Sequence, residues 1–389
     1  MAKKRRGSGE GSIFQRKDGR WVGVITVGYE NGKRLRKTYY GDSRKAARDQ
    51  MTGDLAKQQQ GITIPTGRKT LGEFLDQWLE DSVKPVRSPK TYISYAEQVR
   101  LHIKPAIGHV LLRKLTGPQV QRFLNSLADT DSKNVKGQKL SARTVAYNRT
   151  ILRMALKQAV EWRLIPHNPA ADGIKTAKVE RRRVEAVTVE QAQAILKAVA
   201  AHRLSALFVL YLFTGLRRGE ALGLRWQDVD LDGRKLRVKG QLQRINKQLV
   251  LSEKPKTDHS RRVLTIPQPA VTALREHRAR QLEDRMRLGP DWTDTGLVFA
   301  TELGTPLEPR NIKRALDKLL ENAQLPHCRI HDLRHACATL LIQAGEDLKT
   351  TSEILGHSSI KVTADVYVHI SEAAKERAAD RLGALVEAK

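Results

Sequence analysis

The chain has 389 residues, with 70 Lys and Arg against 42 Asp and Glu, which gives a formal charge of +28 and a pI near 10.3. This length exceeds what usually packs around one hydrophobic core, so we expect two or three domains rather than one. The basic excess favours a polyanionic partner, nucleic acid before any other. The sequence has no run of about 18 apolar residues and no lipidation motif, so we expect no membrane partner.

The basic charge is concentrated toward the N-terminus. Residues 1–69 hold 17 basic and 6 acidic residues, residues 70–183 hold 21 and 10, and residues 184–389 hold 32 and 26. The Lys3 to Arg6 run is followed by Gly and Ser rather than an apolar segment, so we interpret it as a DNA-seeking arm and not as a secretory signal. Cys328 and Cys337 are too few for a disulfide framework and fit a reducing cytoplasm.

Residues 1–64 are predicted to form a small domain of three strands and one helix. The β-prone runs are Ser12–Gln15, Trp21–Tyr29 and Lys33–Tyr40, and Asn-Gly before the third run is a strong hairpin signal. A helix follows from about Ser43, a suitable N-cap, to about Gln60. One sheet face could enter a DNA groove, although a solvated charged face is the alternative. The candidate DNA contacts are Arg16, Lys17, Arg20, Lys33, Arg34, Arg36 and Lys37.

Residues 65–177 are predicted to form a helical domain after a linker at Gln60–Lys69. Helical periodicity marks Leu71–Ser82, Ser88–His102, Gly117–Leu127 and Ser141–Arg163, which suggests a compact four-helix domain. Basic residues on it are candidate phosphate contacts, which would fix the register on DNA without reading bases, or else plain surface. They include Lys90, Arg100, Arg143 and Arg149.

Residues 184–389 are predicted to form a third domain after a charged linker, Lys175–Arg183. It is expected to be mainly helical, with a small sheet at Leu236–Lys239 and Arg262–Ile266. Ser371–Lys389 is expected to be helical and to pack on a neighbouring protomer or back on its own domain. The predicted fold class is therefore a multidomain, mainly α protein.

Five motifs in this third segment follow one another in a fixed order. They are Thr214-Gly-Leu-Arg-Arg-Gly-Glu220, Pro255-Lys-Thr257, His331-Asp-Leu-Arg-His335, Leu355-Gly-His357 and, ten residues after that histidine, Tyr367. Each motif alone is weak evidence, but the ordered set closely resembles the tyrosine recombinase family. The whole chain is similar in plan to phage integrases that carry an N-terminal arm-binding domain.

The resemblance implies a role for each matching residue. Arg217 and Arg334 correspond to the arginine pair, Lys256 to the hairpin lysine, and His331 and His357 to the histidines. Tyr367 corresponds to the nucleophile, and Glu220 to the acidic residue that supports the first arginine. The resemblance implies that residues 1–64 bind arm-type sites, residues 65–177 bind core-type sites, and residues 184–389 form the catalytic domain.

Elementary chemistry gives these residue types the same tasks. A planar guanidinium matches two oxygens of an anionic phosphodiester, so two arginines can stabilise the transition state. A tyrosine with an ordinary pKa of about 10 needs a base or nearby cations to attack at neutral pH, and His331 is the candidate base. Lys256 can protonate the leaving 5′ oxygen if desolvation and neighbouring cations lower its pKa. His357 can donate a hydrogen bond to the phosphate.

A covalent phosphotyrosine conserves the energy of the broken bond, so we expect no nucleotide cofactor and no metal. The sequence has no Gly-rich phosphate loop and no carboxylate cluster of the two-metal kind. The spacing of Cys328, His331, His335 and Cys337 departs from common zinc sites.

The function predicted from the sequence is a site-specific recombinase that integrates or excises a phage genome or mobile element through a 3′-phosphotyrosyl intermediate. The resemblance implies double-stranded DNA and a homotetramer assembled on it, with host DNA-bending and directionality proteins as further partners. Its place would be the bacterial cytoplasm, at the nucleoid. The alternatives are a relaxing enzyme resembling type IB topoisomerases and a non-catalytic DNA-binding regulator.

Overall fold

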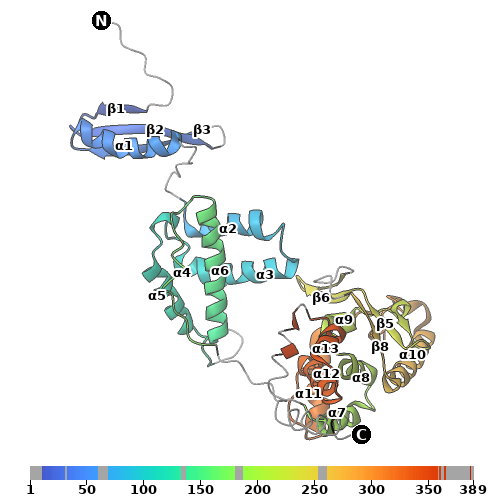
Figure 1. The fold of residues 1–389 in the computed structure, drawn as a ribbon. Helices are drawn as coiled ribbons and strands as arrows, with labels where there is room; N and C mark the ends of the chain where they lie inside the picture. Colours follow the sequence, from blue (N-terminus) through green and yellow to red (C-terminus); the bar gives the residue numbers. More distant parts are fainter. Residues whose placement is uncertain are drawn as a thin grey trace. The chain divides into compact units, whose positions relative to one another are not determined.

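The computed structural model describes residues 11–30, 33–59, 69–132, 137–179, 187–252, 261–357, 359–360, 363–364 and 386. The chain divides into two compact units, residues 1–181 and residues 182–389. In the first unit a sheet with one helix and a group of helices have separate hydrophobic clusters. Figure 1 traces the elements in chain order. The predicted boundaries between three functional domains stay a prediction.

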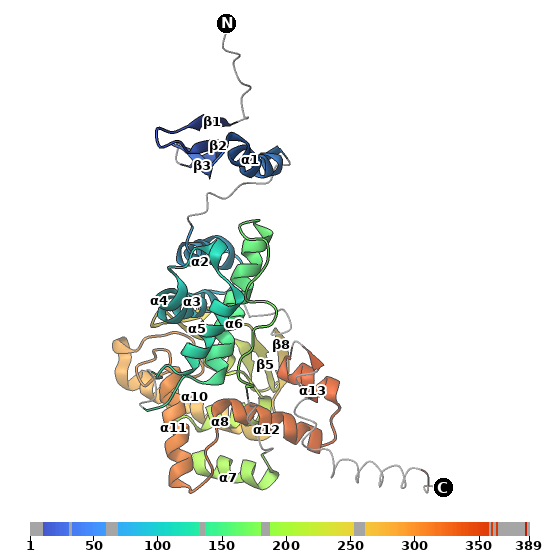
Figure 2. The ribbon, with the colours of Figure 1, turned by 90° about the vertical axis from the view of Figure 1, so that its left-hand side faces the viewer.

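An antiparallel sheet of order β1-β2-β3 begins the described chain, with strands β1 (Ser12–Gln15), β2 (Trp21–Glu30) and β3 (Lys33–Gly41). Helix α1 (Arg44–Gln59) packs on one face of this sheet, as Figure 2 also shows. The hydroxyl of Ser43 accepts from the backbone N–H of Ala46, so the predicted N-cap is confirmed. The three strands and the helix agree with the predicted ranges to within one residue at the bounds. The predicted Asn-Gly turn lies outside the described residues.

The helical part of the first unit contains the four predicted helices, two of which change pitch. Leu71–Ser82 is an α-helix that continues as a π-helix, and Ser88–His102 does the same. The elements are α2 (Leu71–Trp78), π-helix η1 (Leu79–Val83), α3 (Pro89–Gln98), π-helix η2 (Val99–Ile103), α4 (Lys104–Ile107), the 3-10 turn η3 (Leu112–Lys114), α5 (Gly117–Ala128) and α6 (Ala142–Glu161). Leu79, Val83, Val99 and Ile103 are buried, so the π-helical turns keep apolar side chains directed into the core.

The second unit is mainly helical, as predicted, with small antiparallel sheets. Strands β5 and β8 confirm the two predicted strands, while β4 and the β6-β7 hairpin were not predicted. In order the elements are α7 (Val189–Val199), α8 (Ser205–Thr214), α9 (Arg218–Leu222), 3-10 turn η4 (Trp226–Asp228), β4 (Val229–Asp230), β5 (Lys235–Val238), β6 (Gln241–Ile245), β7 (Gln248–Ser252), β8 (Arg262–Thr265), α10 (Gln268–Leu288), 3-10 turn η6 (Gly289–Asp291), α11 (Pro309–Asn322), α12 (Ile330–Gln343) and α13 (Leu348–Leu355).

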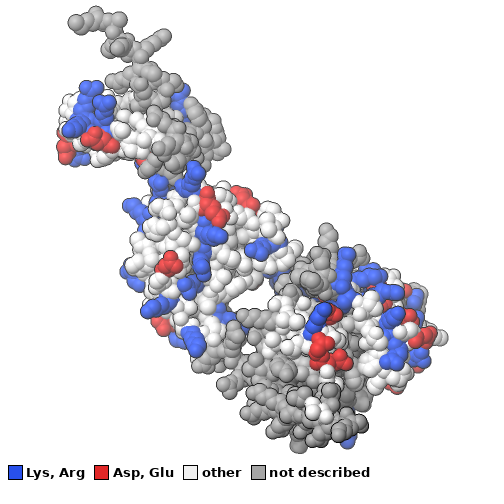
Figure 3. Space-filling model, in the orientation of Figure 1, with Lys and Arg blue, Asp and Glu red and all other residues white. Residues whose placement is uncertain are grey.

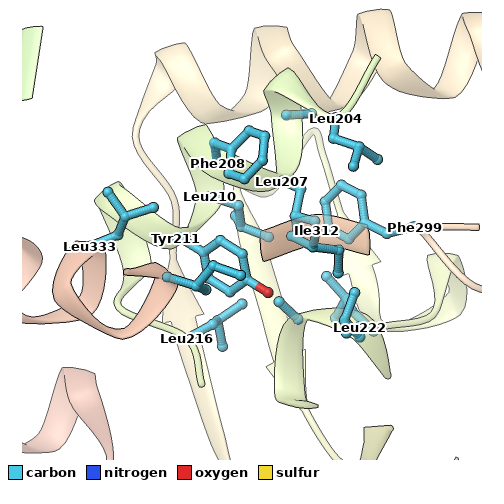
Figure 4. Packing of buried hydrophobic residues seen from close by; sticks show 14 of the residues in the cluster. Leu204, Leu207, Phe208, Leu210, Tyr211, Leu216, Leu222, Phe299, Ile312 and Leu333 are labelled. Carbon is cyan, nitrogen blue, oxygen red and sulfur yellow. The ribbon is translucent and has the colours of Figure 1, made fainter. Parts of the chain in front are cut away.

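Helix α8 lies at the centre of this unit and packs against α7, α10 and α12. Figure 4 shows Phe208 and Tyr211 of α8 packed with Phe299, Ile312 and Leu333, which come from three later segments. Nearly every residue of α8 is buried, so the helix is apolar all round. Its C-terminal residue, Thr214, begins the Thr214–Glu220 motif, and the start of this motif is therefore fixed by the core. The predicted helix at Ser371–Lys389 lies outside the described residues, apart from the single residue 386.

Candidate active site

Three motifs are brought together by helix ends rather than by helix interiors. Helix α8 ends at Gly215, whose φ of +58° is left-handed, and α13 ends at Gly356, whose φ is +66°. Such C-caps favour glycine because a Cβ atom is strained at this φ. A Cβ on Gly215 would in addition lie 2.2 Å from the Leu355 side chain. Gly215 thus lets the Thr-Gly motif approach Leu355 of the Leu-Gly-His motif closely.

Arg217 is positioned by its own helix. It is the N-cap of α9, and the carboxylate of Glu220 accepts both its backbone N–H at 3.0 Å and its Nη1 at 2.7 Å. The Arg217 Nη2 donates to the carbonyl of Gly356 at 2.5 Å. The Arg217 side chain is 38% exposed, whereas that of Glu220 is 5% exposed. Arg217 can therefore present charge to solvent while a buried carboxylate holds it.

Glu220 stays ionised although it is buried. Burial favours its protonated form, but Arg262 and Arg217 outweigh that effect and hold the pKa of Glu220 below its ordinary value. Since a buried carboxylate with two cationic partners is fully charged at neutral pH, it can orient both guanidinium groups. The sequence-based support role for Glu220 thus has a direct geometric basis.

Arg334, on the first turns of α12, is buried with 3% of its surface exposed. Its Nη1 donates to the carbonyl of Gly215 at 2.5 Å, and its Nη2 donates to the carbonyl of Leu355 at 2.7 Å. Burial and the nearby charge of Arg217 lower the pKa of Arg334 to about 9, which still leaves it charged at neutral pH. Arg334 therefore joins the ends of α8 and α13, and its buried charge adds positive potential to the site.

The two candidate histidines are neutral in the DNA-free protein. Burial, together with Arg334 and Arg217, lowers the pKa of His357 to about 4. His331 is exposed at its surface. Partial desolvation of its ring, together with His335 and Arg334, nevertheless lowers its pKa to about 4 as well. A neutral imidazole can accept a proton, which is what the candidate base must do.

His331 and His335 form an edge-on ring pair with centroids 4.7 Å apart, because residues i and i+4 share one face of α12. Cys337 is buried in a small hydrophobic cluster with Ala338 and Leu355, so it is a packing residue. Among the described residues, no three His, Cys, Asp or Glu side chains are grouped so that they could hold a metal ion.

Lys256 and Tyr367 lie outside the described residues. Arg217, Glu220, Arg334 and His357, in contrast, meet at the C-terminal end of α13. Two neighbours of the site were not predicted. Arg262, the first residue of β8, donates to Glu220 at 3.1 Å, and the buried Thr363 hydroxyl lies 2.8 Å from Nδ1 of His357. Strand alternation could have revealed Arg262, since it shares the inward parity of Leu264; nothing in the sequence marks Thr363.

The predicted DNA contacts of the N-terminal sheet lie on different faces. Arg16, Lys17 and Arg20 are exposed around the β1-β2 turn, and Arg34 and Arg36 are exposed on β3. Lys37 has the opposite parity on β3 and pairs with Asp54 of α1, so it lies on the helix-covered face. Lys33 begins β3.

The helical part carries its candidate contacts on several elements. Lys90, Arg100 and Arg143 are exposed. Arg149 is half-buried and donates to the backbone carbonyl of Ala171 at 3.3 Å. Figure 3 shows Lys and Arg side chains along the visible face of this part, with some acidic side chains between them.

Comparisons with known proteins identify the family of this chain. The Phage integrase family matches residues 185–374, and the phage integrase N-terminal SAM-like domain matches residues 70–128. A XerC-like tyrosine recombinase of Caldanaerobacter subterraneus subsp. tengcongensis is 32% identical over 93% of this chain and 95% of its own length. An integrase of Streptomyces ambofaciens is 29% identical over 94% and 93%, respectively. The chain belongs to the phage integrase family of tyrosine recombinases, enzymes that break and rejoin DNA strands.

Solved structures show the same fold. The integrase of transposon Tn1549, residues 82–397 in complex with a circular-intermediate DNA, matches with a TM-score of 0.68 and 20% identity over 80% of this chain and 99% of that chain. A lambda integrase dimer bound to a core site matches with a TM-score of 0.55 and 19% identity over 95% and 97%. These structures show the fold, and the family match together with the sequence relatives identifies the chain as a DNA recombinase of the integrase kind. None of the helices in the described ranges is long and apolar enough to span a membrane.

Proposed function

We propose that Tyr367 attacks the scissile phosphodiester and forms a 3′-phosphotyrosyl bond while the 5′ oxygen leaves. In this scheme His331 takes the proton of the tyrosine, and Lys256 donates a proton to the leaving oxygen. A 5′ hydroxyl from the partner duplex then attacks the phosphotyrosine, which releases Tyr367 and joins the strands. Every bond broken is replaced by one of the same kind, so the reaction needs no co-reactant.

One observation carries this assignment of residues. Arg217, Arg334 and His357 are up to 140 residues apart in sequence, yet all three lie at the C-terminal end of α13. Two guanidinium groups and a neutral imidazole around one point suit a phosphodiester, because the arginines offset the negative charge that grows in the transition state. The partly exposed Arg217 contacts the phosphate in this proposal, and the buried Arg334 acts through its charge.

The test is a Tyr367→Phe variant on a nicked core-site duplex, with covalent adduct resolved on denaturing gels. We expect DNA affinity within about twofold of the parent, because no charge is lost, and no adduct at all. Tyr40→Phe, the same change at an exposed tyrosine of the N-terminal sheet, is the matched control and should form the adduct normally. An adduct that persists in the Tyr367 variant would rule out this nucleophile and the residue assignments that depend on it.

We infer that the first 64 residues bind arm-type sites and that residues 65–177 bind core-type sites. Support comes from the exposed arginines of the open face of β3 and from the exposed basic side chains of α3 and α6. A lambda integrase tetramer bound to a Holliday junction has the same fold, with a TM-score of 0.55. We propose that this chain assembles as a homotetramer on DNA in the bacterial cytoplasm, encoded by a phage or mobile element and helped by host bending and directionality proteins.

A further inference from the structure

The C-terminal end of α13 is held by three arginines, and one of them has no role in the reaction as proposed. The last carbonyls of this helix accept in succession from different guanidinium groups. Arg262 Nε donates to Ile354 at 2.8 Å, Arg334 Nη2 donates to Leu355 at 2.7 Å, and Arg217 Nη2 donates to Gly356 at 2.5 Å. These carbonyls have no partner within the helix, and they form the negative end of its dipole, so cations stabilise them.

Arg262 also reaches the catalytic arginine through Glu220. Its Nη2 donates to Oε2 of Glu220 at 3.1 Å, and the same oxygen accepts the backbone N–H of Arg217 at 3.0 Å. The side chains of Arg262 and Glu220 are only 8% and 5% exposed. In a buried pair the geometry is well defined, and loss of Arg262 leaves Glu220 with Arg217 as its remaining cationic partner.

The close approach of Arg262 restricts what can end the helix. A Cβ atom on Gly356 would lie 2.8 Å from Nη1 of Arg262, so a side chain there would displace the guanidinium. The residue after Gly356 is His357. A single buried guanidinium therefore contacts both the peptide chain that leads to His357 and the carboxylate that orients Arg217.

We propose that Arg262 is a positioning residue for the recombination reaction, fixing Arg217 through Glu220 and His357 through the end of α13. This inference rests on the proposed roles of Arg217 and His357. Arg262 begins β8, which follows directly on the segment that carries Lys256. Arg262 thus connects β8, the strand that follows Lys256 in the sequence, to Arg217 and His357, the groups proposed to bind the phosphate. Lysine cannot replace it fully, because one ammonium cannot reproduce the planar fork that serves two acceptors.

The experiment compares Arg262→Met and Arg262→Lys with the parent, using a saturating concentration of core-site duplex and adduct formation as the readout. We expect DNA affinity within about twofold of the parent, and a cleavage rate lowered by about 10- to 100-fold in the methionine variant, since small misplacements of catalytic groups have effects of this size. The lysine variant should be intermediate because it restores the charge. Arg275→Met, at an exposed arginine paired with Asp232, is the matched control and should cleave at the parent rate.

A double-variant cycle separates positioning from general destabilisation. If Arg262 acts through Arg217 and His357, adding Arg262→Lys to Arg217→Ala should lower the rate by less than the product of the two separate losses, because only its action through His357 is left, whereas independent effects multiply. Multiplying losses, or an Arg262→Met protein that cleaves as fast as the control, would overturn the inference. If the methionine variant does not fold, the lysine variant and its cycle still decide. Unchanged cleavage in Arg217→Ala alone would instead contradict the proposed function.

Discussion

The ring of His357 is hydrogen-bonded to one of the described side chains. Its Nδ1 lies 2.8 Å from the hydroxyl of Thr363, which is fully buried. If that hydroxyl donates to Nδ1, the ring proton resides on Nε2, which is then able to donate to a phosphate oxygen. Binding of an anionic phosphate would also oppose the effect of Arg334 and Arg217, the cations that help burial to lower the pKa of His357.

We expect Thr363→Val to slow cleavage about 10-fold and to leave DNA affinity unchanged. Valine keeps the size and branching of threonine but cannot donate a hydrogen bond, so the orientation of His357 is no longer fixed. Hydrogen-bonding partners of metal-bound histidines, the comparable case, contribute about 10- to 100-fold to activity. Single-turnover adduct formation measures the effect, and Thr363→Ser, which retains the hydroxyl, should restore most of the rate. Equal rates for the valine and serine variants would mean that the hydroxyl has no role.

Single residues also show where sequence reasoning succeeds. The side chains of Arg217, Glu220 and Arg334 belong to local motifs, and the structure brings them together. Strand parity predicts that Arg262 points inward, but its contacts with the site, like those of Thr363, are tertiary and have no signal in the sequence. Arg262 meets Glu220 across 42 residues, and a hydrogen-bonding partner for a histidine has no fixed sequence spacing. Lys37 was predicted to contact DNA but lies on the helix-covered face of the sheet. Strand parity alone would have predicted this, because it places Lys37 on the same side as Tyr39.

At the scale of elements, alternation and periodicity predicted the strands and helices well, but pitch changes and tight turns less so. Asn246 and Lys247 both have positive φ at the β6-β7 turn. The turn contains no glycine, so the usual sequence signal for this conformation is absent and the hairpin was not predicted. The π-helical turns after α2 and α3 follow no local signal, because they are fixed by the packing of Leu79 and Val99 in the core.

Helix α10 carries a buried histidine outside the active site. His277 is 3% exposed, contacts Phe299 and Trp226, and its Nε2 lies 2.7 Å from the carbonyl of Val298. Burial lowers the pKa of His277 and outweighs the hydrogen bond to Val298, which acts in the other direction. The folded protein therefore holds this ring neutral below the pH at which an unfolded histidine, with a pKa of about 6.5, takes up a proton.

We expect the packing of α10 on α8 to weaken as pH falls below about 6.5, the ordinary histidine pKa. In that range the unfolded chain binds a proton that folded His277 does not, so the opening free energy falls by up to about 1.4 kcal/mol per pH unit. Above it both states are neutral and the contribution is constant.

Amide hydrogen exchange in α8 and α10 between pH 5.5 and 7.5 measures the slope. His277→Gln, which retains a donor near Val298, should flatten it, and His109→Gln, at an exposed site, should not. An unchanged slope in His277→Gln would assign the pH dependence to another group.

At the scale of the whole molecule, the distribution of charge differs between the N-terminal segment and the segment that carries the motifs of the family. Residues 1–69 carry 17 basic and 6 acidic residues, while residues 184–389, with the catalytic motifs, carry 32 and 26. Phosphate contacts determine how steeply affinity falls with salt, because each neutralised phosphate releases counterions. Under the proposed function, the strongly basic N-terminal segment would therefore add affinity for DNA that the reaction proposed at Tyr367 does not itself need.

Removing residues 1–68 should separate these contributions, provided that the N-terminal segment binds arm-type sites as proposed. The β1-β3 sheet and α1 have their own hydrophobic cluster, distinct from that of the helical part, so their loss leaves the helical core complete. A protein beginning at Lys69 should form the Tyr367 adduct on a short core-site duplex at the parent rate. On a long substrate with flanking arm sites it should lose recombination, because tethering no longer raises the local concentration of the second site. Its affinity for that substrate should also fall less steeply with salt.

Adduct yield, recombinant yield and salt slope are measured side by side for both proteins. Full recombination of the long substrate by the shortened protein would show that residues 1–68 are not an arm-binding module, whereas failure on the short duplex as well would indicate that they support the catalytic steps directly.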